Sequence, residues 1–164
     1  MPKLLLLCSF LIFSGCANTL TTDSYAKIQL GMTAEQALQN LEGYTIDKLS
    51  LQEPDNCYYL VPTKGVNGVY LMILDEKVAR IDIYDKQLAI KTQRGLGIGD
   101  SKTQVLNSYP QTTVSPHPYT SPEGEYLEVA LENGNGIIFE TYHKTVTNFR
   151  LGSYPALGYI EGCL

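Results

Sequence analysis

The spacing of apolar and polar positions changes several times along the chain. Residues 4–13 form an apolar run in which Ser9 is the one polar residue. Residues 37–41 and 105–109 have apolar positions at helical spacing, which predicts two amphipathic helices. Each helix is followed by stretches in which apolar and polar residues roughly alternate, a pattern typical of half-buried strands. These strands are predicted at residues 44–51, 57–61, 69–74, 78–84, 112–119, 125–132, 137–142 and 146–151.

Both helices have the same start signal. Thr33 and Ser101 are each followed three positions later by a glutamine, Gln36 and Gln104. This spacing predicts a capping box, in which the hydroxyl accepts a bond from an N–H of the first turn and the glutamine bonds back. A further short helix is expected over residues 24–30, just before the first capping box.

The two helix-and-strand stretches match each other after a shift of 68 positions, which takes Gly31 to Gly99 and Leu38 to Leu106. A unit of this size buries little core by itself. We therefore predict an α+β fold of two tandem helix-plus-antiparallel-sheet repeats of about 68 residues each, with the helices packed on one face of a joined sheet. The expected divisions are 1–15 for a signal peptide, 16–23 for a tether, 24–90 for the first unit and 91–164 for the second unit with a C-terminal tail.

The apolar run at the N-terminus is too short to span a bilayer, which takes about 20 residues in a helix. It follows Lys3 and ends at Ser14-Gly15-Cys16, so it predicts an export signal. The stretch FSGC resembles the lipobox of bacterial lipoproteins, which implies cleavage before Cys16 and acylation of that cysteine. An ordinary secretory signal or an uncleaved anchor is the alternative. By the same resemblance, Ala17 after the cysteine implies anchoring in the outer membrane, facing the periplasm.

Four cysteines are present. Cys8 lies in the signal and Cys16 in the lipobox, which leaves Cys57 and Cys163 as a pair in an oxidising compartment. We predict that these two form a disulfide. Neither has the neighbouring Cys or His that a metal site needs.

Composition and charge exclude some functions. The net charge is −5 and the pI about 5.0, whereas nucleic-acid binding needs clustered basic residues. His117 and His143 stand apart from any nucleophile motif, and the stretch GLGIGD (95–100) lacks the spacing of a phosphate-binding loop. We expect no cofactor, no metal, no nucleic-acid partner and no enzymatic activity.

The chain has 12 tyrosines and no tryptophan. Strand alternation, phased on the charged positions, places several tyrosines with Met and Arg on the sheet face that points away from the helices. Tyr, Met and Arg are enriched in protein-recognition surfaces. Alternatives are that these tyrosines only favour strand formation, or that the chain after Gly152 covers them. The candidate binding face consists of Tyr58, Tyr70, Met72, Arg80, Tyr84, Tyr126, Tyr142 and Arg150.

The run IQLGMTAEQALQNL (28–41), after a lipobox cysteine, resembles the SmpA/OmlA (BamE-type) family of outer-membrane lipoproteins. A doubled unit of this kind resembles the architecture of β-lactamase-inhibitor proteins, whose joined sheet grips another protein. The resemblance implies a non-enzymatic protein-binding lipoprotein, an adaptor or inhibitor whose partners are the membrane, through its lipid, and another envelope protein. The alternative function is a structural envelope lipoprotein that organises the outer membrane or peptidoglycan. A hydrolase is disfavoured, since no nucleophile and base are paired.

Overall fold

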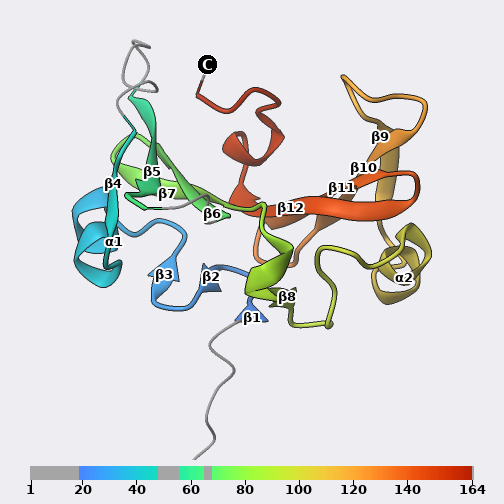
Figure 1. Cartoon of the computed structure of the whole chain (residues 1–164), viewed down its shortest axis with the longest axis horizontal. Coiled ribbons are helices and arrows are strands. Elements are labelled where there is room, and N and C mark those ends of the chain that lie inside the picture. Colours follow the sequence, from blue (N-terminus) through green and yellow to red (C-terminus); the bar gives the residue numbers. More distant parts are fainter. Residues whose placement is uncertain (1–18, 48–55, 65–67, 164) are drawn as a thin grey trace, which may run out of the picture.

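The computed structural model describes residues 19–47, 56–64 and 68–163. Their strands form an eight-stranded sheet in the order β4-β5-β6-β7-β12-β11-β10-β9 and a four-stranded sheet in the order β3-β2-β1-β8 (Figure 1). The strands of the large sheet are β4 (Tyr44–Ile46), β5 (Cys57–Pro62), β6 (Val69–Leu74), β7 (Lys77–Ile83), β9 (Thr113–Pro116), β10 (Gly124–Ala130), β11 (Asn135–Tyr142) and β12 (Thr145–Ser153). Those of the small sheet are β1 (Thr19–Leu20), β2 (Ser24–Tyr25), β3 (Ile28–Gln29) and β8 (Lys91–Thr92).

The helices are short. α1 (Ala34–Asn40) and α2 (Lys102–Ser108) have seven residues each, and η2 (Lys86–Leu88) and η3 (Ala156–Gly158) are single 3-10 turns. Both predicted capping boxes are confirmed: Thr33 accepts from the Gln36 amide and Ser101 from the Gln104 amide, and each glutamine bonds back. None of the described helices is long and apolar enough to cross a membrane.

The predicted α+β class of two helix-plus-sheet repeats, with helices forming the layer on a joined sheet, is wrong. Strand makes up 45% and helix 15% of the described residues, in two sheets rather than one. The segment expected to be a helix is the β2–β3 hairpin, in which Tyr25 pairs with Ile28 and Ala26 has a positive φ of 52°. Strand β1 then pairs in parallel with β8, and the small sheet lies between α1 and α2 (Figure 1).

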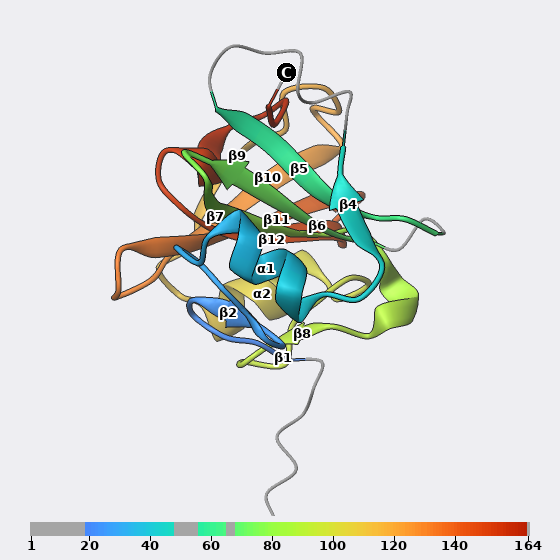
Figure 2. The same ribbon diagram turned by 90° about the vertical axis from the view of Figure 1, so that its left-hand side faces the viewer.

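The main core lies between the large sheet and the layer formed by α1, α2 and the small sheet (Figure 2). The large sheet contributes Leu71, Ile81, Phe139 and Phe149, all at most 1% exposed. The helices contribute small side chains, Ala37 and Val105, and the small sheet contributes Leu20 and Ile28. The two helices and the small sheet therefore cover this face of the large sheet together. Core side chains alternate along most of each strand, and register shifts at Met72/Ile73 and Glu140/Thr141 change the parity locally, so that Val78 and Val146 also face the core.

A second apolar cluster lies on the opposite face of the sheet. It contains Cys57, Met72 and Ala79 from the strands, with Ala156 and Cys163 from the segment that follows β12. The pairing of β7 with β12, which aligns Asp82 with Arg150 and Arg80 with Gly152, sets the middle of this face. We call residues 154–163 the strap, because this segment crosses the face and is tied down at its end.

Candidate functional site

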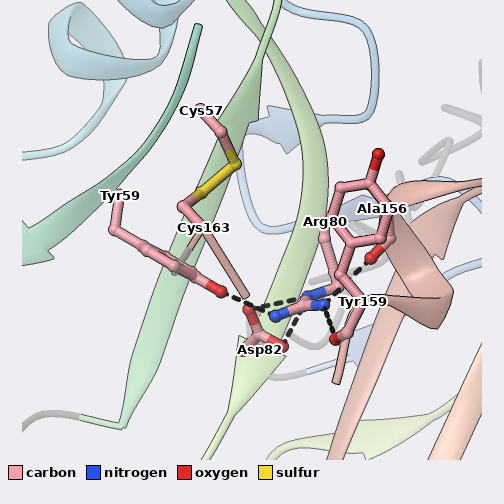
Figure 3. The surroundings of a disulfide bond; sticks show 7 residues. All are labelled: Cys57, Tyr59, Arg80, Asp82, Ala156, Tyr159 and Cys163. Carbon is pink, nitrogen blue, oxygen red and sulfur yellow. Dashed lines mark hydrogen bonds and ion pairs between the residues drawn. A yellow bond between two sulfur atoms is a disulfide. The ribbon is translucent and has the colours of Figure 1, made fainter. Parts of the chain in front are cut away.

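The strap is fixed to the sheet by the predicted disulfide, which is confirmed. Cys57 in β5 and Cys163 at the end of the strap are joined, with Cα atoms 5.3 Å apart (Figure 3). Both cysteines are less than 10% exposed, at 7% and 5%. The bond therefore holds the end of the chain against the strand that forms one side of the face.

Arg80 in β7 is the main polar anchor of the strap. Its Nη1 donates to the carbonyl oxygens of Ala156 at 2.9 Å and Tyr159 at 2.8 Å, and its Nη2 donates to the Tyr59 hydroxyl at 2.6 Å (Figure 3). Its Nε bonds Asp82 at 3.1 Å. Arg80 is 2% exposed, so one buried guanidinium joins two strands to the strap.

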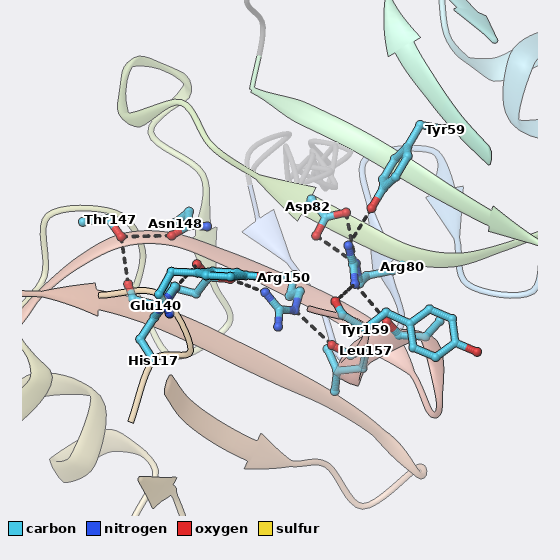
Figure 4. Close-up of polar contacts among 12 residues, drawn as sticks. Tyr59, Arg80, Asp82, His117, Glu140, Thr147, Asn148, Arg150, Leu157 and Tyr159 are labelled. Carbon is cyan, nitrogen blue, oxygen red and sulfur yellow. Dashed lines mark hydrogen bonds and ion pairs between the residues drawn. The ribbon is translucent and has the colours of Figure 1, made fainter. Parts of the chain in front are cut away.

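Arg150 in β12 is the second anchor. Its Nε donates to the carbonyl oxygen of Leu157 at 2.9 Å, and its Nη1 pairs with Glu140 of β11 (Figure 4). The guanidinium carbon lies 5.1 Å from the centre of the Tyr126 ring, a cation–π contact. We call Arg80, Asp82, Glu140 and Arg150 the clamp, because the two arginines bond carbonyl oxygens of the strap and the two carboxylates pair with the arginines.

Charge compensation explains how the clamp tolerates burial. Burial raises the pKa of the Asp82 carboxyl, while the Arg80 charge and its hydrogen bond oppose that shift. Burial lowers the pKa of Arg80, but the charge of Asp82 opposes this, and the pKa is raised overall. Buried charges persist when paired and hydrogen-bonded, and the clamp consists of two such ion pairs, Arg80 with Asp82 and Arg150 with Glu140.

His117 extends the clamp to the β9–β10 loop. Its Nε2 lies 3.2 Å from Glu140 Oε2, and its Nδ1 accepts the backbone N–H of Tyr119 at 3.1 Å. Since Nδ1 accepts, the ring proton sits on Nε2 and is donated to Glu140. The Tyr119 hydroxyl bonds Glu161 of the strap, so the loop and the strap are linked.

The candidate binding face predicted from the sequence divides into three groups in the structure. Met72, Arg80 and Arg150 are on the expected face, but they are at most 4% exposed because the strap covers them. Tyr70 and Tyr126 are half-buried there, and the Tyr70 ring lies against the tilted ring of Tyr84, with ring centres 5.5 Å apart. The exposed members of the predicted face are Tyr84, at 47%, and Tyr142, at 46%.

The placement of Tyr58 on this face is wrong. Tyr58 pairs with Ile73 and lies in the main core, 7% exposed, with its hydroxyl 3.0 Å from Glu76. Tyr59, its neighbour, pairs with Met72 and reaches Arg80 instead. Two consecutive tyrosines leave the phase of β5 ambiguous, although Leu60, of the same parity as Tyr58, marks the core side.

Sequence reasoning also missed the exposed apolar side chains of the strap and of the β9–β10 loop. These residues lie in irregular segments, where no alternation fixes the direction of a side chain. They are Tyr119 at 64%, Tyr154 at 48%, Tyr159 at 37% and Ile160 at 49% exposed.

A cleft of about 530 Å³ lies on the other side of the molecule, where the small sheet meets α2 and the β10–β11 turn. Leu20, Val129 and Ile137 are buried in its floor, and exposed polar residues such as Gln93 and Gln111 form its rim. No predicted site residue lines this cleft. Among the described residues, no group of His, Cys, Asp or Glu is arranged to hold a metal ion.

No protein-family model matches the sequence, and no curated protein matches it. The structure resembles the 1.5 Å crystal structure of an extracellular protein containing an SCP domain from Bacillus anthracis str. Ames, with a TM-score of 0.51 and 11% sequence identity. The match covers 76% of this chain and 44% of that protein, so the chain spans less than half of its length. At this identity the likeness concerns the fold alone.

Proposed function

We propose that this protein is an outer-membrane-anchored, periplasmic lipoprotein that binds another envelope protein without enzymatic activity. The proposed contact surface is the face of the large sheet that the strap crosses. The observation that carries the proposal is a set of exposed apolar side chains on that face, above the buried clamp. They are Tyr84 directly after β7, Tyr119 on the loop, and Tyr154, Tyr159 and Ile160 on the strap.

These side chains belong to one surface. The Tyr84 ring lies 5.5 Å from the ring of Tyr70, which pairs with Asp82 of the clamp, so Tyr84 stands beside the clamp. Tyr119 bonds the strap through Glu161. Tyrosine supplies a large contact area with few rotatable bonds, which is why it is frequent at protein interfaces.

A binding role fits the clamp better than catalysis. Both guanidinium groups are occupied by carboxylates and by carbonyl oxygens of the strap. A general acid or base must reach a substrate proton, whereas the Glu140 carboxylate accepts bonds from Arg150 and His117. The two arginines of the clamp therefore serve to hold the strap on the sheet.

Anchoring through Cys16 rests on the sequence pattern of the first 17 residues. Cys16 lies three positions before Thr19, where β1 begins. At about 3.3 Å per residue, such a short connection keeps the folded domain within roughly 10 Å of its lipid. Labelling of cells with radioactive palmitate tests this part: the wild type should be labelled, and Cys16→Ser should not.

Cross-linking and affinity capture from envelope fractions test the binding face. Tyr84→Ala and Tyr119→Ala should each lower the yield of specifically cross-linked protein at least several-fold. Val114→Ala is the matched control, because Val114 is 41% exposed but pairs with the core residue Leu127 and points to the other face. Equal yields from all variants would overturn the proposal. Capture of peptidoglycan in place of protein would favour the structural alternative.

A further inference from the structure

We infer that the middle of this sheet face is a peptide-binding site, that the strap occupies it in cis, and that a peptide segment of the partner protein is its occupant in trans. The inference rests on the proposed protein-binding function and names the part of the partner that is recognised. The site consists of the clamp and of a socket at Gly136, described below.

Recognition by the clamp depends on main-chain atoms. Arg80 and Arg150 donate to the carbonyl oxygens of Ala156, Leu157 and Tyr159. Every peptide carries such carbonyl groups, so these bonds are available to any chain that follows the same path. Charged donors make hydrogen bonds about twice as strong as neutral ones.

One side chain of the strap enters a fitted socket. Leu157 is 0% exposed and packs on Gly136 of β11. A Cβ atom built on Gly136 would lie 2.5 Å from Leu157 Cδ2, so the socket exists only because residue 136 has no side chain. The site therefore selects for an aliphatic residue placed between two clamped carbonyl groups.

The strap leaves part of the site unpaired. Arg150 Nη2 is buried and has no hydrogen-bond partner among the described residues, whereas Asp82 Oδ1 is paired with Arg80 Nε at 2.9 Å. Arg150 and Asp82 stand directly opposite each other on β12 and β7. A buried donor in this position matches an accepting group, such as the carboxamide oxygen of Asn or Gln. A partner peptide with that side chain would satisfy the site better than the strap does.

The strap is also attached in a way that lets a partner peptide take its place on the sheet. The sheet ladder ends at Ser153, which pairs with Asn135. The backbone bonds described within the strap are local turns, from Gly158 to Pro155 and from Tyr159 to Ala156. The attachments of residues 154–162 to the sheet are side-chain bonds and the Leu157 contact. These residues can therefore move away from the sheet without breaking a strand pair, while the disulfide keeps Cys163 in place.

The experiment uses the whole mature chain and a fluorescent synthetic peptide with the sequence of residues 153–162, SYPALGYIEG. A Leu157→Ala, Cys163→Ser variant weakens the attachment of the strap in two places, because it removes the side chain in the socket and the disulfide. Fluorescence polarisation should show the peptide binding this variant at least ten-fold more tightly than the oxidised wild type. Hydrogen–deuterium exchange should show faster exchange at the variant's residues 154–163.

Two comparisons test the details of the site. Adding Arg80→Gln to the variant should abolish peptide binding, whereas adding Arg94→Gln, an exposed arginine away from the strap, should not. A peptide with Asp in place of the leucine should not bind. An exchange-protected strap in the variant, or an open strap that does not bind the peptide, would overturn the inference. Either result would leave the capture experiment with Tyr84→Ala unaffected, so failure of the site and failure of the proposed function are separable.

Discussion

Arg80 donates a 2.9 Å hydrogen bond to the carbonyl oxygen of Ala156, 76 positions later in the chain. The same guanidinium reaches Tyr59, Asp82 and Tyr159. This side chain therefore joins the middle of the large sheet to the segment that covers it. It connects the stability of the fold to the shape of the proposed binding face.

Arg80→Gln should loosen the strap and leave Asp82 as a buried carboxylate without its main partner. Removal of one member of a buried pair costs about 3–5 kcal/mol, so chemical denaturation should show a loss of this size. Hydrogen exchange of residues 154–163 should accelerate more than that of the main core. Arg94→Gln is the control, because Arg94 is exposed. Equal losses at the two arginines would contradict the anchoring role of Arg80.

Gly136→Ala should displace the strap, because the new Cβ would lie 2.5 Å from Leu157 Cδ2 and 3.1 Å from the Tyr154 hydroxyl. Overpacking of a fitted contact typically costs about 1–3 kcal/mol. Leu157→Ala removes the obstructing atoms, so the double variant should be more stable than the sum of the two single effects predicts. A double-mutant cycle by denaturation measures this coupling. Additive effects would mean that residues 136 and 157 do not touch.

Loss of the disulfide should lower the free energy of unfolding by about 2–5 kcal/mol, since the bond spans a sequence separation of 106 and restricts the unfolded chain. Cys57→Ser combined with Cys163→Ser, and the reduced wild type, should show similar losses by urea denaturation. Thiol titration of the unfolded, non-reduced mature chain should find neither cysteine free. Two free thiols there would rule out the bond in solution.

Local rules explain what could be predicted from the sequence. The capping boxes at Thr33 and Ser101 depend on three-residue spacing, and both are present. The cysteine pair followed from the compartment and from counting, and the bond is present. Strand parity placed Arg80 and Arg150 on the face opposite the main core, as their positions confirm.

The errors come from contacts between distant segments. Residues 24–30 have helical spacing, but pairing of β1 with β8, about 70 residues away in the chain, draws this segment into a sheet. The parity of β5 could not be fixed by two adjacent tyrosines, and burial of Leu60 decides it. The strap has no periodic pattern, and its position depends on Arg80 and Cys57, which lie far away in the sequence.

The capping hydroxyls should contribute measurably to stability even though the helices are short. Thr33→Ala and Ser101→Ala should each lower the free energy of unfolding by about 1 kcal/mol, because each leaves a first-turn N–H without its acceptor. Thr103→Ala, an exposed position within α2, is the control and should change stability by less than about 0.5 kcal/mol. If Thr33→Ala and Ser101→Ala lower the free energy of unfolding no more than Thr103→Ala does, the capping bonds are not formed in solution.

Tyr58 should make the fold sensitive to alkaline pH. Burial, followed by the hydrogen bond to Glu76 and the charge of Glu76, raises the pKa of Tyr58 to about 12 from the ordinary value of 10.0. Between these two values the unfolded chain has lost the phenolic proton and the folded chain keeps it, so the free energy of unfolding falls as the pH rises. Below pH 10 both states hold the proton, and Tyr58 adds no pH dependence.

Tyr58→Phe should therefore flatten the decline of stability between pH 10 and about 12. The slope of the unfolding free energy against pH should change by up to one proton, measured by urea denaturation at several pH values. Tyr142→Phe is the matched control, since Tyr142 is 46% exposed. An unchanged slope in Tyr58→Phe, or an equal change in Tyr142→Phe, would show that Tyr58 ionises as readily in the folded chain as in the unfolded one, and that its hydroxyl is not buried against Glu76.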